Sequence, residues 1–142
     1  RGLARRLPAI DRTKKTPAAV DSRRVIRLVI DGGNRVTLDG KTVTMKEIRQ
    51  RTAQFVEANG KGHLIQLQTD RKASYDTYLH VQNQLVAAYN AVRNRRSSGL
   101  FGKTFDQCSR EQQDQVASEV PIRITEVYAV GGLEKTVKGG GR

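Results

Sequence analysis

The stretch that decides the fold is His63-Leu-Ile-Gln-Leu-Gln-Thr-Asp-Arg-Lys-Ala-Ser-Tyr-Asp-Thr-Tyr78. The apolar-rich run Leu64–Leu67 has no helical period, which predicts a short buried strand. Thr69–Lys72 is polar and predicts a sharp turn. Ser74 stands where an N-cap belongs, and apolar and aromatic residues then recur at helical spacing to about Arg96. This strand, turn and helix form half of a βαβ unit.

The residues before this stretch predict a β-hairpin and a helix. Two β-branched runs, 23–30 and 35–38, flank the turn signal Asp31-Gly-Gly-Asn34, and 41–43 makes a short return strand. Thr44-Met-Lys-Glu47 is a capping box, in which the Thr hydroxyl and the Glu carboxylate each bind the backbone amide at the other's position. The helix that it opens is expected to end at Asn59-Gly60.

The residues after the long helix predict an insert and a last strand. A glycine- and serine-containing loop is expected over 97–108, and the capping box Ser109-Arg-Glu-Gln112 opens a short helix to about Ser118. The alternating stretch 121–128 reads as a strand. The fold class is therefore α/β in the α+β two-layer sense: β-hairpin-α-β-α-β, with one mixed sheet, two helices on one face and a short helical insert.

Length and charge predict one modest domain with two tails. We expect a flexible basic arm over 1–22, a domain over 23–130 with its insert at about 97–118, and a disordered tail over 131–142. The net charge is +12, and residues 1–24 alone hold eight Lys and Arg against two Asp. Such a dense arm favours an anionic surface nearby, although a solvated linker gives the same composition.

No constellation of residues indicates catalysis, and no cofactor or metal is expected. Cys108 is the single cysteine, and His63 and His80 do not fit a zinc spacing. No apolar run of about 18 residues is present, and no signal peptide is recognised. Because Arg1 is not a methionine, we expect a fragment or a processed form.

Two features leave more than one interpretation open. Asp70 follows a central strand, where open α/β sheets bind ligands, but a turn carboxylate that caps the following amides is the favoured reading. Tyr75, Tyr78 and Tyr89 recur at helical spacing, which favours packing at the edge of the core over a platform for stacking bases.

Taken in order, these residues resemble the periplasmic domain of the ExbD/TolR family of biopolymer transport proteins, in a long form similar to that of Bacteroidetes. The resemblance rests on Asp70-Arg71 followed by Tyr75, on Val36-Thr-Leu-Asp-Gly40, and on Leu7-Pro8-Ala9 in the arm. The 93–119 segment and Val120-Pro-Ile-Arg-Ile-Thr-Glu126 extend it.

The resemblance implies a single-pass inner-membrane protein whose present segment lies in the periplasm, with a proton-accepting aspartate upstream of Arg1. It implies a homodimer inside an ExbB-like or TolQ-like channel pentamer that uses the proton motive force to move TonB or TolA. A TonB-like protein is expected to dock as an added strand on the arm and the first strand, at Leu7, Pro8, Ala9, Val25, Ile26, Arg27 and Leu28.

Two alternative functions stay open. A TolR-like component of the Tol-Pal envelope system would bind peptidoglycan. The net charge alone fits a basic nucleic-acid-binding domain, although the family resemblance makes nucleic acid an unexpected partner.

The insert is expected to pack beside the long helix and to extend a dimer surface.

Overall fold

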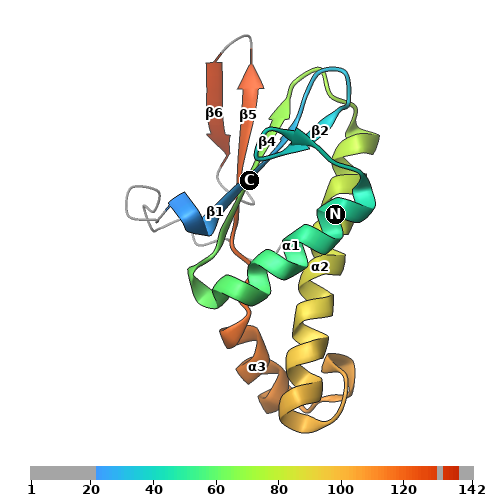
Figure 1. Ribbon diagram of the computed structural model, residues 1–142, viewed down its shortest axis with the longest axis vertical. Coiled ribbons are helices and arrows are strands. Elements are labelled where there is room, and N and C mark those ends of the chain that lie inside the picture. Colours follow the sequence, from blue (N-terminus) through green and yellow to red (C-terminus); the bar gives the residue numbers. More distant parts are fainter. Residues whose placement is uncertain (1–21, 131–132, 138–142) are drawn as a thin grey trace. The chain divides into compact units, whose positions relative to one another are not determined.

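A computed structural model describes residues 22–130 and 133–137 of the chain (Figure 1). In these described residues the fold is α+β, with one mixed sheet and three α-helices, which confirms the predicted class. The chain divides into two compact units. The sheet unit contains the residues up to Val43, Leu64–Leu79 and those from Ile122 on, and the helical unit contains Thr44–His63 and His80–Pro121.

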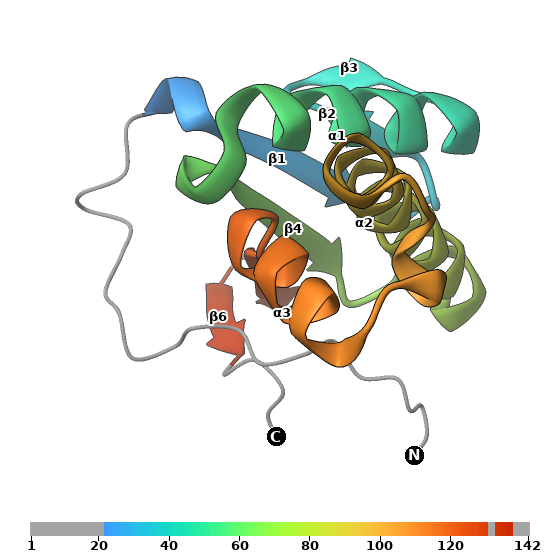
Figure 2. The same cartoon turned by 90° about the horizontal axis from the view of Figure 1, so that it is seen from below.

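The described part of the sheet unit contains six strands in the order β3-β2-β1-β4-β5-β6. β1 pairs antiparallel with β2 and parallel with β4, and the arrows of β1 and β4 run in the same direction in Figure 2. β4 in turn pairs parallel with β5. A 3₁₀ turn at Ser22–Arg24 leads into β1. The strands are β1 (Val25–Ile30), β2 (Val36–Leu38), β3 (Lys41–Thr42), β4 (Leu64–Asp70), β5 (Ile124–Val130) and β6 (Leu133–Val137).

The alternation of apolar residues explains which side of the sheet is buried. Ile26, Leu28 and Ile30 of β1 are buried, and the register places them beside Ile65, Leu67 and Thr69 of β4. The intervening residues of both strands are at least partly exposed, apart from Leu64. One face of the central strands therefore carries the core, as a period of two requires.

The helices begin and end largely where local signals place them. α1 spans Met45–Asn59, with the capping box of Thr44 and Glu47 present, and the φ of Gly60 is 52°. α2 spans Tyr75–Phe101, and its cap is Ser74, whose Oγ accepts a bond from the Thr77 amide. α3 spans Arg110–Glu119 behind the predicted box of Ser109 and Gln112.

Several boundaries differ from the sequence-based expectation. The strand expected to end at Leu67 continues to Asp70, because Thr69 and Asp70 pair with Tyr128 and Ala129 of β5. The segment 97–101, expected as a loop, is the last part of α2. Ser97 is fully buried there, and Gly102, with a φ of 70°, ends the helix by donating its amide to the Ser98 carbonyl.

Two further differences concern the carboxyl-terminal segment. The prediction of a disordered tail is wrong for Leu133–Val137, which forms β6 and pairs antiparallel with β5 (Figure 1). The strand expected from 121 begins at Ile124, because the pairing of β5 with β4 begins there, opposite Ile65. The 3₁₀ turns at Gly60–Gly62 and Phe105–Gln107 complete the described structure.

Candidate interaction surface

β1 is the strand predicted to receive a partner, and the structure places it inside the sheet. Along its whole length it pairs with β4, from Val25 opposite Leu64 to Ile30 opposite Thr69. On its other side, β2 pairs only with Leu28–Ile30. Most of β1 is therefore closed to an added strand within the described part of the chain.

Asp39, which follows β2, continues the hydrogen bonding along β1 as far as Arg27. The Arg27 amide donates to Asp39 Oδ1 at 2.9 Å, and the Asp39 amide donates to the Arg27 carbonyl at 2.8 Å. Both main-chain groups of Arg27 therefore face β2. Because these groups alternate along a strand, those of Val25 face the same side, beyond the point that β2 and Asp39 reach.

The predicted docking residues therefore differ in whether their main-chain N–H and C=O groups are available to an added strand. Arg27 has its main-chain groups bonded to Asp39, and those of Ile26 and Leu28 face β4. Only Val25 presents main-chain groups on a side where no described strand pairs. Leu7, Pro8 and Ala9 lie outside the described residues.

The family-motif turn lies at the opposite, carboxyl-terminal end of β1 and β4. Asp70 Oδ1 accepts a bond from the Lys72 amide at 2.8 Å, and the Asp70 carbonyl accepts one from Ala73. Asp70 therefore caps its own turn, which supports the favoured reading of this residue. Arg71, next in the turn, is exposed.

This turn is tied to the β1–β2 turn. Asn34, with a φ of 66°, accepts a bond on its Oδ1 from the Ser74 amide at 2.7 Å. Asp31 Oδ1 accepts bonds from the amides of Gly33 and Arg35, and these bonds lower the pKa of Asp31 below its ordinary value, that from Arg35 being the larger cause. The two turns therefore fix the start of α2. The sequence showed both turns but not the bond that joins them.

The three tyrosines of α2 have different environments. Tyr75 is 68% exposed and stacks on Tyr78 with ring centroids 6.2 Å apart. The Tyr78 hydroxyl donates to Glu126 Oε1 of β5 at 2.7 Å. Tyr89 is buried. The packing interpretation therefore fits Tyr78 and Tyr89, whereas Tyr75 presents an aromatic ring at the surface.

Within the helical unit, Arg93 joins α2 to the end of the insert. Its Nε and Nη2 donate to the Val120 carbonyl at 3.0 and 2.9 Å, and its guanidinium lies 5.6 Å from the centre of the Phe105 ring. Burial lowers the pKa of Arg93, because desolvation disfavours its charged form, while Tyr89 acts in the opposite direction. Asn94 Oδ1 also accepts a bond from the Phe105 amide.

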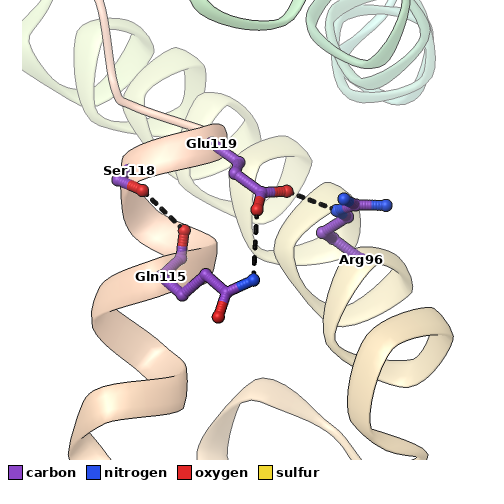
Figure 3. Close-up of polar contacts among 4 residues, drawn as sticks. All are labelled: Arg96, Gln115, Ser118 and Glu119. Carbon is purple, nitrogen blue, oxygen red and sulfur yellow. Dashed lines mark hydrogen bonds and ion pairs between the residues drawn. The ribbon is translucent and has the colours of Figure 1, made fainter.

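A second, more exposed contact lies one turn further along α2 (Figure 3). Arg96 Nε donates to Glu119 Oε1 at 2.5 Å, and Gln115 of α3 donates to the other carboxylate oxygen. The bond from Arg96, and then that from Gln115, lower the pKa of Glu119. The insert therefore packs beside the long helix, as predicted. Its role in a dimer surface stays a prediction.

A buried histidine completes the helical unit. His63 is fully buried, and its Nδ1 lies 2.7 Å from the Gly60 carbonyl and its Nε2 2.5 Å from the Tyr89 hydroxyl. Because a carbonyl only accepts, Nδ1 carries a proton, and in the neutral ring Nε2 accepts from Tyr89. His63 therefore acts in packing, between Tyr89 and an edge-on contact with Phe55.

Two further features are absent from residues 22–130 and 133–137, a metal-ligand cluster and a membrane-spanning helix. No group of three or more His, Cys, Asp or Glu side chains there is arranged to hold a metal ion. None of the helices in that part of the chain is both long and apolar enough to cross a membrane.

Comparison with known families gives one result. The family model described as "Biopolymer transport protein ExbD/TolR" matches residues 2–95. The match begins in the arm, includes β1, β4 and the turn that follows, and ends within α2, so the insert and β5 lie outside it. No curated protein matches the chain.

Proposed function

Because the chain belongs to the ExbD/TolR family of biopolymer transport proteins, we propose that it is the periplasmic part of an inner-membrane motor of the ExbB–ExbD type. Members of this family are transport accessory proteins, anchored in the inner membrane with periplasmic domains, and they work with ExbB/TolQ-type partners. In the proposal, the proton motive force moves this domain, and the domain passes the motion to a TonB-like protein that energises transport across the outer membrane.

The observation that carries the proposal is that no described strand pairs with β1 on the β2 side at Val25, its first residue. The arm joins β1 where Val25 offers main-chain donors and acceptors, and an extended peptide adds to a sheet through such groups. Leu7-Pro8-Ala9 in the arm is the second expected contact. We propose that a TonB-like segment pairs with the arm and reaches the sheet at Val25, with Ile26, Arg27 and Leu28 supporting that position from within the sheet.

The full-length protein is proposed to be a single-pass membrane protein that acts as a homodimer within a pentameric ExbB-like or TolQ-like channel. Asp70, Arg71 and Tyr75 are proposed to shape the start of α2 rather than to react. Asp70 is held by its own turn, while Arg71 and Tyr75 are exposed there. Dimerisation is tested by analytical ultracentrifugation of the chain, alone and after joining to a membrane helix.

The partner is tested by calorimetric titration with purified TonB-like and TolA-like carboxyl-terminal domains. The proposal expects binding of the TonB-like domain and a loss of that binding when residues 1–21 are removed. Binding of the TolA-like domain instead, together with sedimentation of the chain with purified cell wall, would support the TolR-like alternative. Binding to DNA that exceeds binding to both domains would support the nucleic-acid alternative.

A further inference from the structure

The sheet has a second face, opposite to the one that carries the core. Its side chains alternate along the strands with the buried ones. The strand pairings place Thr37, Val29, Gln68 and Val127 in one row across β2, β1, β4 and β5. All four of these residues are partly exposed. We name the face on which this central row lies the outer face of the sheet.

The central row of the outer face carries no charge, although 28% of the residues of the chain are charged. Two β-branched apolar residues, Val29 and Val127, stand in it with the short polar residue Thr37 and the amide Gln68. Surfaces that stay in water are usually rich in Lys and Glu, whereas the centre of a protein contact is depleted of charge. The composition of the row therefore fits a contact with another protein surface.

Charges of opposite sign stand on the two sides of the central row. Arg27 precedes Val29 by two residues, and its Nε donates to Gln66 Oε1 of β4 at 3.0 Å, so its side chain lies over the outer face. Asp70 follows Gln68 by two residues and, by alternation along β4, belongs to the same face. The cation and the anion are therefore each about 7 Å from the central row.

This arrangement is complementary to itself. If a second copy faces the first across a two-fold axis that runs along the central row, the row meets itself. The strands of the two copies then run in opposite directions, so Arg27 of each copy faces Asp70 of the other. Such a contact uses the same patch on both copies, as in most homodimers. Sheets packed face to face lie about 10 Å apart, a gap that side chains of this size fill.

The area of the outer face indicates how strong such a contact is. The face extends about 23 Å along the seven residues of β4 and about 19 Å across four strands, or about 440 Å² in projection. A stable interface buries about 800 Å² on each partner, so this face alone supports only weak association. Two copies anchored side by side in a membrane have an effective concentration of roughly millimolar, which makes weak association sufficient.

We propose that the outer face is the surface through which two copies of this domain contact each other, with the central row at the two-fold axis and Arg27 paired with Asp70 of the other copy. This inference rests on the proposed function for the homodimer, and it goes beyond that function by naming the surface and the pairing. The contact holds the two sheets face to face and leaves their edges outside it.

The test follows the NMR spectrum of the isotopically labelled 142-residue chain as its concentration rises. We expect concentration-dependent shifts at Val29, Thr37, Gln68 and Val127, with a dissociation constant on the order of 0.1–1 mM. The same signals should shift fully when the chain is joined to a membrane helix that dimerises. Shifts confined to other residues, or none in the joined chain, would overturn the proposal.

A matched pair of variants locates the contact. Gln68→Lys places a cation from each copy near the axis, and we expect self-association to weaken at least roughly tenfold, since like charges repel across an interface. Gln54→Lys makes the same change at an exposed position of α1, and affinity should stay within roughly twofold. Equal losses in both variants would show that only net charge matters and would contradict the proposal.

A third variant tests the pairing of charges. Arg27→Gln should weaken self-association by roughly two- to tenfold and reduce its dependence on salt, because one exposed ion pair is lost on each side of the axis. Unchanged affinity and salt dependence would contradict the proposed orientation of the two copies. Thermal unfolding shows whether each variant is folded.

The result is separable from that for the proposed partner. A chain that binds a TonB-like domain but does not associate through the outer face, even when joined to a membrane helix, would remove only this inference. A chain that associates through this face and binds no TonB-like domain would remove the proposed partner and leave the dimer surface in place.

Discussion

The contact between Arg93 and Val120 predicts a measurable share of the stability of the helical unit. We consider Arg93→Met, which keeps an unbranched side chain of similar length and removes all donors. The variant loses two bonds to a carbonyl whose residue is 6% exposed and a cation–π contact with Phe105. The Val120 carbonyl is then left without this donor in a buried position.

The magnitude follows from these contacts. Bonds from a charged donor contribute about 1.5–3 kcal/mol, and a cation–π contact adds about 0.5–1 kcal/mol. The parent chain must desolvate Arg93, and Met avoids that cost. We therefore expect the free energy of unfolding to fall by about 1–3 kcal/mol, with a decrease in Tm of roughly 3–10 °C.

The assay is urea and thermal unfolding followed by circular dichroism. Arg96→Met is the matched control, because Arg96 lies one turn away on the same helix and bonds to Glu119 near the surface. Exposed ion pairs contribute little, so this control should change stability much less than Arg93→Met. An unchanged Tm for Arg93→Met, or an equal loss in the control, would refute the reasoning.

Three further predictions concern other parts of the chain. Gly99→Ala should raise the free energy of unfolding by about 0.5–1 kcal/mol, because position 99 is inside α2 with open space for a Cβ. Gly102→Ala should lower it by about 1 kcal/mol, because the φ of 70° at this position disfavours any side chain. A destabilised Gly99→Ala together with a stabilised Gly102→Ala in chemical denaturation would contradict the assigned end of α2. Leu28→Ala should cost about 2–5 kcal/mol in the same assay, since Leu28 is fully buried in β1, and a loss below about 1 kcal/mol would argue against the assigned register. Asp31 has a lowered pKa when folded, so its stabilising effect is present above its ordinary pKa of 3.8 and is lost as the pH falls through the lower folded value. Asp31→Asn should therefore flatten the acid limb of the stability–pH curve, and an unchanged acid limb would show that the turn amides do not stabilise the carboxylate.

Local sequence signals were sufficient to predict the helices and strands that short-range interactions determine. The capping boxes at Thr44 and Ser109 and the cap at Ser74 satisfy amides within three residues, so the sequence alone places three helix starts. The β-branched run of β1 and its turn at Asp31 are equally visible. These elements supplied the pattern that carried the family resemblance.

The errors arose where distant residues decide the structure. Ser97-Ser98-Gly99 favours a loop by composition, yet α2 continues through these residues to Phe101, with Ser97 buried. β6 exists through its pairing with β5, and the only sequence signal for it was the strand-forming pair Thr136-Val137.

The same limit applies to the candidate surface. The main-chain groups of Arg27 are bonded to Asp39, which lies twelve residues away in the sequence. The bond from Arg93 to Val120 joins residues that are twenty-seven positions apart. Neither has a local signature. The predicted docking set therefore included residues of β1 that the sheet already uses.

The most direct measurement is an NMR titration of the isotopically labelled chain with a TonB-like carboxyl-terminal domain. We expect amide signals of residues 1–30 to shift, the Val25 amide to become protected from exchange, and signals of α3 to stay in place. Shifts confined to the helices, or none at saturating partner, would contradict the claim that this chain passes motion to its partner through the arm and the start of β1.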